Sequence, residues 1–281
     1  MFRTKMLGYL KNKTDSVSKN YTAALKNTDP EGLHDLRVDI KRLRAYFGLV
    51  DSINRDFDMK GEFKYFRNIA RNTGSLRDAQ VQLKLLAHLV GTTGFEVSGF
   101  AGYLKNYETK ARERFEKFSK KKPLKNSREC RKSISRSLKA VSPVRADTRV
   151  QGYFYNLRNN LILLNEDKNL HEATLHEVRK LSKKTHYVLE IIQPCFDIFK
   201  DSKPFIKNLS QVHKILGEWH DYDVCLGHLK IFQKKNPEAF AASQLPDLLK
   251  HVKNTKRGLV KDIHREFDKF SKAAALYEHR K

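Results

Sequence analysis

Cysteine, glycine, proline and long apolar runs are all scarce in this chain of 281 residues. The three cysteines, Cys130, Cys195 and Cys225, form no CxxC pair, which argues against a disulfide framework or a zinc ribbon and favours a reducing compartment. Only 13 glycines and 7 prolines interrupt the chain, which favours helices. Because the first residues lack the apolar region of a signal peptide and no apolar run could cross a bilayer, we expect a soluble, cytoplasmic protein without a membrane span.

Acidic residues are outnumbered by basic ones. The chain has 56 Lys and Arg against 32 Asp and Glu, a formal net charge of +24. Self-repulsion of this size destabilises a compact chain unless an anionic partner offsets it. Since 40% of the residues are hydrophobic, a packed core is expected. A polyanion or an anionic membrane surface is therefore the expected partner, with non-specific basicity as the alternative.

Apolar residues recur with helical spacing along nearly the whole sequence, without strand-like alternation. The segment Asp29-Pro30-Glu31 predicts a helix start, because it supplies an N-cap acid, a proline in the first turn and a second acid. Gly91 and Gly94 predict a break. We therefore predict an all-α fold, with helices over residues 30–51, 60–89, 95–121, 148–165, 170–199, 204–234 and 245–274.

Two motifs occur twice, in the same order and at nearly the same spacing. The first motif contains His34, Arg37, Lys41, Arg42 and Arg44, which correspond to His176, Arg179, Lys183, Lys184 and His186. The second motif contains Arg71, Gly74, Arg77 and Asp78, which correspond to Lys214, Gly217, His220 and Asp221. Chance similarity does not explain two such blocks, so we interpret the chain as an internal duplication with halves at residues 1–143 and 144–281.

The first motif gathers its cations on one side of a helix. At 100° per residue, His34, Arg37, Lys41 and Arg44 fall within about 80° of one another. The opposite side is apolar: Leu36, Ile40, Leu43 and Phe47. The second motif repeats the arrangement, with Val178, Leu181, Leu189 and Ile192 on its apolar side. Because like charges at this spacing destabilise a helix, two such faces indicate an anionic ligand, with a merely solvated face as the alternative.

A weaker row of cations precedes the second motif. Lys64, Arg67 and Arg71 are spaced i, i+3, i+7, and their counterparts are Lys207, Ser210 and Lys214. Asp78 and Asp221 are expected to support the site by orienting Arg or Lys side chains through salt bridges. Gly74 and Gly217 lie within helical patterns, where glycine is unfavourable, so we expect a close helix crossing at each.

These motifs resemble the CHAD family, whose name stands for conserved histidine α-helical domain. The family pattern is a His, an Arg three residues later, a basic pair and a further basic residue, and then a Gly with an Arg-Asp pair in a later helix. Both halves match it, except that His186 and His220 stand where the first half has Arg44 and Arg77. The resemblance implies two four-helix bundles related by a pseudo-twofold axis, with a central basic cavity or pore that binds inorganic polyphosphate.

The motifs and the resemblance together predict the polyphosphate-binding side chains. Direct contacts are expected first from Arg37, Lys41, Arg44, Arg179 and Lys183, since Arg and Lys donate to phosphate oxygens. The complete set is His34, Arg37, Lys41, Arg42, Arg44, Lys64, Arg67, Arg71, Arg77, His176, Arg179, Lys183, Lys184, His186, Lys207, Lys214 and His220. The two histidines that replace Arg predict a greater pH dependence of binding in the second half, since imidazole is mostly uncharged at neutral pH.

A nucleic-acid-binding module is the first alternative, because the charge permits it. The basic faces carry no interleaved aromatic residues for stacking on bases, so we expect only weak, non-specific nucleic-acid binding. A membrane-surface role would need a free apolar helix face, and these faces are committed to the core.

A metal-dependent phosphohydrolase is the second alternative, since His34-Asp35 and His220-Asp221 resemble metal-binding pairs. The repeat aligns His220 with Arg77, however, and Arg does not ligate a metal. We therefore expect no enzyme activity, no metal and no cofactor. The expected partners are polyphosphate, polyphosphate granules and polyphosphate-metabolising enzymes, in the cytoplasm or at granules.

Overall fold

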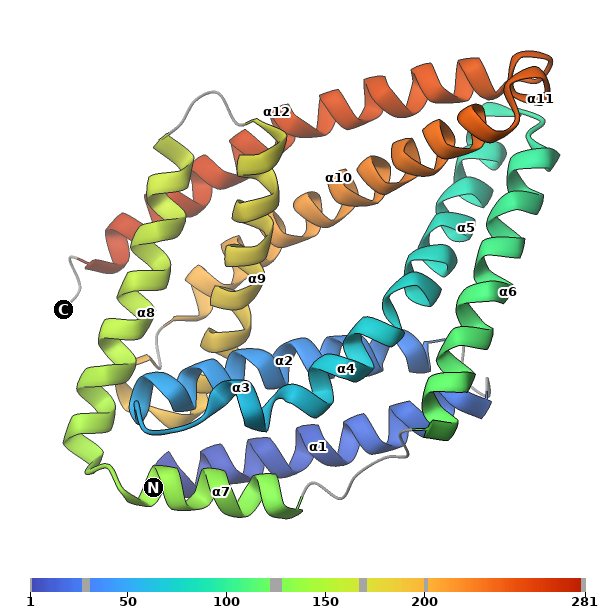
Figure 1. Cartoon of the computed structure of the whole chain (residues 1–281). Helices are drawn as coiled ribbons and strands as arrows, with labels where there is room; N and C mark the ends of the chain where they lie inside the picture. The colour runs from blue at the N-terminus through green and yellow to red at the C-terminus, as the bar shows by residue number, and fades with distance from the viewer. Residues whose placement is uncertain (1, 27–30, 122–127, 167–170, 200–201, 279–281) are drawn as a thin grey trace. The chain divides into compact units, whose positions relative to one another are not determined.

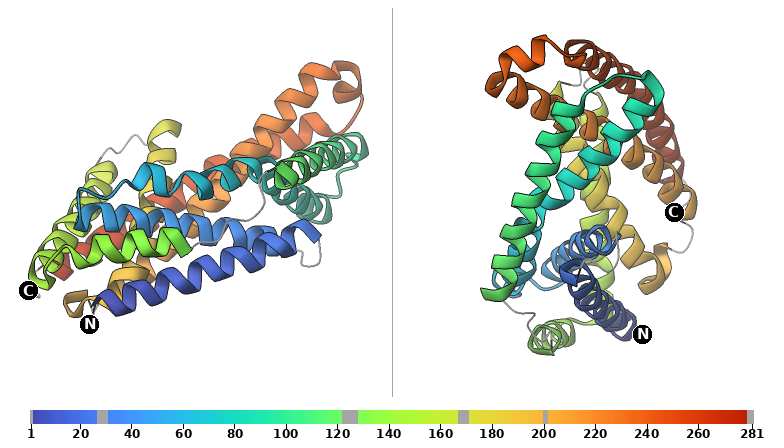
Figure 2. Two further views of the ribbon diagram at one scale, coloured as in Figure 1. Left: turned by 60° about the horizontal axis from the view of Figure 1, so that its bottom comes forward. Right: turned by 90° about the vertical axis from the view of Figure 1, so that its right-hand side faces the viewer.

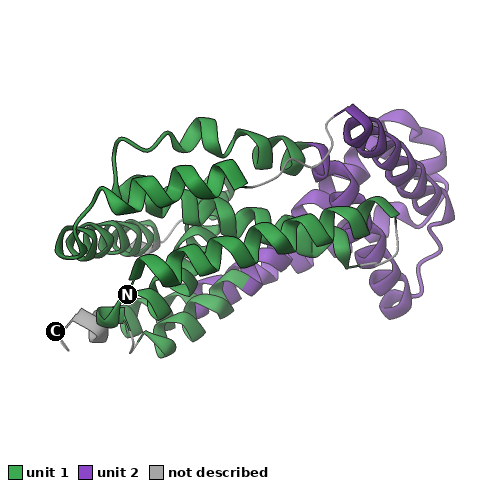
Figure 3. Ribbon diagram, turned by 90° about the horizontal axis from the view of Figure 1, so that it is seen from below, with its two compact units in different colours: residues 1–71, 122–213, 267–281 green, residues 72–121, 214–266 purple. Residues whose placement is uncertain are grey.

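The computed structural model describes residues 2–26, 31–121, 128–166, 171–199 and 202–278. Every regular element within these ranges is a helix, which confirms the all-α prediction. The chain forms two compact units (Figure 3): unit 1 is residues 1–71, 122–213 and 267–281, and unit 2 is residues 72–121 and 214–266. Each unit combines segments from both halves of the repeat, so the halves at 1–143 and 144–281 stay a prediction.

Unit 1 is built around helix α2, which packs on α1, α7, α8 and α9. Figure 1 labels these helices, and Figure 2 shows α1 and α7 running alongside α2. The unit also takes in the start of α10 and the end of α12. Its other elements are α1 (Phe2–Lys26), α2 (Gly32–Ile53), α3 (Met59–Glu62), nearly all of α4 (Lys64–Asn72), α7 (Arg128–Lys139), α8 (Pro143–Glu166), α9 (Glu172–Cys195) and the 3-10 turn η1 (Asp197–Phe199).

Phenylalanine side chains hold unit 1 together. The buried ring of Phe47 on α2 lies 5.5 Å from that of Phe63 and 6.0 Å from that of Phe66, between centroids. Phe154 on α8 makes similar contacts with the rings of Phe199, at 5.2 Å, and Phe205, at 5.7 Å. Aromatic pairs at these distances contribute beyond the area they bury. They fix α4 against α2, and η1 and the start of α10 against α8.

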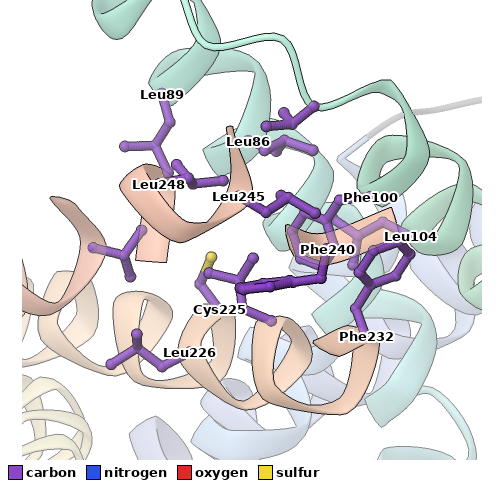
Figure 4. Close-up of a cluster of buried hydrophobic side chains, with 13 residues drawn as sticks. Leu86, Leu89, Phe100, Leu104, Cys225, Leu226, Phe232, Phe240, Leu245 and Leu248 are labelled. Carbon is purple, nitrogen blue, oxygen red and sulfur yellow. The ribbon is translucent and has the colours of Figure 1, made fainter. Parts of the chain in front are cut away.

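Unit 2 contains α5 (Gly74–Thr93), α6 (Ser98–Lys121), most of α10 (Lys203–Lys235), α11 (Pro237–Ala241) and the first part of α12 (Leu245–Glu278). Gly94 ends α5 in the left-handed region with φ 72°, at the predicted break. The core of the unit is one buried apolar cluster to which all five helices contribute (Figure 4), including Leu86, Phe100, Phe232, Phe240 and Leu248.

The predicted helix over residues 60–89 is wrong in detail, because three helices, α3, α4 and α5, occupy this stretch. Breaks fall at Phe63, which packs on Phe47, and at Thr73, which is fully buried. These tertiary contacts override the continuous helical pattern. Gly74 therefore begins a helix. At Gly217 an added Cβ would meet no atom within 4 Å in the described part of the chain, so the predicted close crossing there is wrong.

The remaining predicted helices are present within a few residues of their expected bounds, and three further helices, α1, α7 and α11, were not predicted. Helix α7 lies in a strongly basic stretch, and Ile134 and Leu138 are its only fully buried residues, which leaves little apolar periodicity to detect. The predicted start at Asp29 and Pro30 lies outside the described residues, and Glu31 directly precedes α2.

Candidate anion-binding site

Helices α2 and α9, which carry the two copies of the first motif, pack against each other and against α8 in unit 1. Their apolar sides are buried as predicted: Leu36, Ile40, Leu43 and Phe47 on α2, and Val178, Leu189 and Ile192 on α9. Leu181 is the exception, because it is half-buried and lines a cavity. Burial of these faces fixes the rotation of both helices and so the direction of their cations.

A cavity of about 1130 Å³ lies in unit 1, lined by α2, the segment that follows α2, α8 and α9. Five predicted binding residues line it: Lys41, Arg44, Arg179, Lys183 and Lys184. The lining also contains three cations that the sequence motifs do not predict: Arg55, Arg149 and Lys180. Asp51 and Glu177 are the acids of the lining. The excess of basic groups makes the cavity suited to a polyanion.

The three cations that were not predicted differ in whether the sequence indicates them. Lys180 directly follows Arg179 of the motif and forms an ion pair with Glu177, so its sequence position was a usable signal. Arg149 donates a hydrogen bond to the carbonyl oxygen of Ile53, at the end of α2. Arg149 and Arg55 belong to neither motif, so only the folded chain brings them to the cavity.

Lys184 and Arg44 show that the two helices bring their cations close together. The ammonium of Lys184 lies 5.2 Å from the centre of the Tyr153 ring of α8. Partial burial lowers the pKa of Lys184, the nearby charge of Arg44 lowers it further, and Asp51 opposes both effects. A bound anion would relieve the repulsion between these two cations.

His213, at the end of the α10 segment in unit 1, is affected by cations from both α2 and α9. Burial lowers the pKa of His213 to about 3, and the charges of Lys183, His186, Arg179 and Lys41 add to the effect. His213 is therefore neutral at physiological pH. Cations from α2 and α9 thus act on one point of the structure.

Arg42 and His186, both predicted binding residues, share Glu190 of α9. The Nε of Arg42 lies 2.9 Å from Oε2 of Glu190, and the Nε2 of His186 lies 3.2 Å from Oε1. Burial raises the pKa of Glu190, but the hydrogen bonds from His186 and Arg42 and their charges outweigh it and lower the pKa to about 2. These two cationic positions therefore contact an acid, and neither lines the large cavity.

The other predicted residues of unit 1 also lie outside the large cavity. Arg37 donates to the carbonyl oxygen of Ala70 at 2.8 Å, and Arg67 donates to that of Lys60 at 2.9 Å. Lys207 and His186 line a separate cavity of about 330 Å³. The remaining four are Lys64 and Arg71, which are exposed, and His34 and His176, which are half-buried.

The predicted residues of the second motif belong to unit 2, except for Arg71. They are Arg77, Asp78, Lys214, His220 and Asp221. The Nδ1 of His220 lies 3.6 Å from Oδ1 of Asp221, its neighbour in the sequence, and the supporting role of this acid stays a prediction. Asp78 and Lys214 are exposed.

Two further features of the described chain concern membrane spans and metal ligands. No described helix is both long and apolar enough to span a membrane. Among the residues that the structure describes, no group of three or more His, Cys, Asp or Glu side chains gathers in a way that could hold a metal ion.

Comparisons with known proteins agree with this architecture. None of the curated proteins matches the chain. The CHAD domain from the plant Ricinus communis has a similar structure, with a TM-score of 0.74 at 17% identity over 95% of this chain and 92% of that one. PptA from Streptomyces chartreusis has a TM-score of 0.67 at 16% identity over 95% of this chain and 98% of that one. At these identities the likeness shows the fold alone. The CHAD domain profile matches residues 8–230, well over half of the sequence, so the chain belongs to the CHAD domain family.

Proposed function

We propose that this protein binds inorganic polyphosphate in the large cavity of unit 1 and performs no chemistry on it. The observation that carries the proposal is the convergence of two related helices on one cavity. Helix α2 contributes Lys41 and Arg44, and helix α9 contributes Arg179, Lys183 and Lys184. Polyphosphate carries about one negative charge per internal phosphate, so it suits closely spaced cations on rigid supports.

Rigid placement supports binding, because little ordering is left to occur when the ligand arrives. The apolar sides of α2 and α9 are buried, and Arg42 and Glu190 join the two helices at 2.9 Å. Arg44 and Arg179 present planar guanidinium groups that bind phosphate oxygens in pairs, while Lys41 and Lys183 act as point charges. Five of the cations that the sequence predicts for binding are thus available to one ligand in this cavity.

The aromatic residues of the cavity favour polyphosphate over nucleic acid. Tyr153 and Tyr187 are the aromatic members of its lining. Lys184 lies over the ring of Tyr153 at 5.2 Å, and Arg42 lies over the ring of Tyr187 at 5.7 Å. Since a cation already lies over one face of each ring, these rings are less available for the base stacking that single-stranded nucleic acids use. We accordingly propose only weak, non-specific nucleic-acid binding.

Binding without turnover is part of the proposal, as are a cytoplasmic location and association with polyphosphate granules or with enzymes of polyphosphate metabolism. Incubation of the purified protein with polyphosphate and Mg²⁺ or Mn²⁺ tests the first point. We expect no release of phosphate. Release that a cavity variant abolishes would contradict a purely binding role.

Calorimetric titration with polyphosphate tests the site itself. The variant Lys41→Glu with Lys183→Glu reverses one cation on each helix, and we expect about a hundredfold weaker binding, roughly 3 kcal/mol. The control is Lys105→Glu with Lys117→Glu on α6, which changes the net charge equally at two exposed lysines outside the cavity. Circular dichroism should show unchanged helicity in both. Equal losses of affinity in the two variants would mean that net charge, and no particular site, controls binding.

A further inference from the structure

Helix α12 carries a row of cations on its exposed face within unit 2. Lys250, Lys253, Arg257 and Lys261 are all exposed. At 100° per residue they fall within about 80° around the helix, and at 1.5 Å per residue the row is about 16 Å long. We call these four residues the α12 row.

The opposite side of α12 holds the helix in one orientation. Leu248, Val252 and Ile263 are buried there, and Leu248 belongs to the core cluster of Figure 4. Lys256 also points inward: its ammonium lies 2.5 Å from Oδ1 of Asp223 and 5.0 Å from the centre of the Trp219 ring. Because an apolar face and the ion pair of buried Lys256 both fix the rotation of α12, the α12 row is held facing outward.

Helix stability does not explain the α12 row. None of its four cations forms an ion pair with any described residue, and no acid interrupts it. The acids that follow it, Asp262 and Glu266, lie beside Arg265 at 2.8 and 3.6 Å. Helix α6 of the same unit, in contrast, mixes acids and bases along its length, with one pair between Arg112 and Glu108. Four like charges at i, i+3, i+7 and i+11 repel one another and destabilise the helix.

The α12 row also lies beyond the part of the chain that matches the CHAD domain, which ends at residue 230. We propose that it is a second binding surface for linear inorganic polyphosphate, in addition to the cavity of unit 1. The identity of the ligand rests on the proposed function, whereas the location of the surface rests on α12 alone. Polyphosphate presents one strand of charge that can follow a single row of cations. Duplex nucleic acid presents two strands across a groove, and the four positions offer no aromatic side chain for stacking on single strands.

The experiment counts binding equivalents on the full chain. Calorimetry at low salt with a short polyphosphate oligomer, which occupies one site at a time, is applied to four proteins. They are the unchanged chain, the row variant Lys253→Glu with Lys261→Glu, the cavity variant Lys41→Glu with Lys183→Glu, and the α6 control Lys105→Glu with Lys117→Glu. We expect two equivalents for the unchanged chain and the control, and one for each of the other two variants. The equivalent left in the cavity variant should weaken steeply with added salt, because its cations are exposed.

The outcomes separate the two proposals. A single equivalent that survives in the row variant and is lost in the cavity variant would overturn the α12 surface and leave the cavity function standing. Two equivalents in the cavity variant would overturn the cavity function instead. A parallel titration with duplex DNA tests whether the α12 row binds nucleic acid instead. If the row variant loses DNA binding but keeps both polyphosphate equivalents, the α12 row is a nucleic-acid surface and the proposal is wrong.

Discussion

Glu190 of α9 accepts hydrogen bonds from both Nε and an Nη of Arg42 on α2, at 2.9 and 3.3 Å. This bidentate contact joins the two helices that line the cavity. Arg42 stands in the basic pair of the motif, directly after Lys41, yet the two neighbours differ in role. Lys41 lines the cavity, whereas Arg42 helps to fix the distance between the two rows of cations.

Replacing Glu190 with Gln should therefore weaken the fold more than the loss of a surface ion pair. We expect Glu190→Gln to lower the free energy of unfolding by about 2 kcal/mol, because half-buried Arg42 loses its bidentate carboxylate and keeps only the longer contact with Asp39, at 3.9 Å. Urea denaturation measures the change. The matched control is Glu177→Gln, whose exposed pair with Lys180 should contribute less than about 1 kcal/mol. If the two substitutions lower the free energy of unfolding equally, the Arg42–Glu190 contact contributes no more to stability than an exposed ion pair does.

The same carboxylate predicts a dependence of stability on acid pH. The pKa of Glu190 lies at about 2 in the folded protein, against a usual value of 4.5. A lowered carboxyl pKa stabilises the fold fully above the unfolded value, and this contribution is lost as the pH falls through the folded value. The difference in unfolding free energy between the unchanged chain and Glu190→Gln should thus be constant above about pH 5 and shrink between pH 4.5 and 2. A difference that grows on acidification would refute this assignment.

Helical periodicity was enough to predict the fold class and the faces of α2 and α9, because burial of residues such as Leu36 and Val178 follows the 3.6-residue repeat. The basic side of each helix follows from the same geometry. Lys41, Arg44 and Lys183 therefore reach the cavity as the sequence suggests.

Contacts between distant segments could not be predicted in this way. Nothing local distinguishes Arg37, which donates to the carbonyl of Ala70, from Arg44, which lines the cavity. The position of His186 likewise depends on Glu190, one turn later on the same helix, whose partner Arg42 comes from α2. The acid that accepts a cation is set by tertiary packing, so a periodic row of basic residues overstates the number available to a ligand.

Lys184 gives the cavity a predictable response to alkaline pH. Partial burial and the charge of Arg44 lower its pKa, so it loses its proton before an ordinary lysine as the pH rises. Polyphosphate affinity should accordingly fall as the pH rises above neutral toward the ordinary lysine value of 10.5. Lys184→Arg should flatten this fall, because guanidinium keeps its charge. The same substitution at Lys180, on the same cavity, is the control and should leave the profile unchanged. If Lys184→Arg does not alter the dependence of polyphosphate affinity on pH, the loss of affinity at high pH is due to other groups.

Gly48 of α2 and Tyr153 of α8 both line the cavity. A Cβ at position 48 would lie 3.0 Å from the Tyr153 hydroxyl oxygen, which is buried and has no hydrogen-bond partner among the described residues. Gly48→Ala should gain about 1 kcal/mol of helix propensity, yet the contact should cancel this gain. In the Tyr153→Phe background the obstacle is gone, so Gly48→Ala should stabilise the protein. Thermal unfolding of the four proteins of this double-mutant cycle measures the coupling. Purely additive effects would show that the two positions do not interact.

Lys256 gives a prediction about unit 2, because a lysine that is only 7% exposed depends on the partners of its ammonium. It lies 2.5 Å from Asp223 and faces the ring of Trp219, the one tryptophan of the sequence. Lys256→Met should destabilise the protein by about 3 kcal/mol, since it leaves Asp223 without this countercharge inside the unit. It should also change the emission of Trp219, which serves as a local probe of the site.

The double variant Lys256→Met with Asp223→Leu removes both charges and is the control for loss of the lysine packing. It should recover most of the lost stability, because an apolar pair of similar volume can replace a buried ion pair at little cost. Chemical denaturation followed by Trp219 fluorescence measures the double variant and each single variant, Asp223→Leu included. If the double variant is as unstable as the sum of the two single changes, the Lys256 ammonium does not depend on Asp223. The orientation of α12, and with it the outward face of the α12 row, would then have to rest on its apolar residues alone.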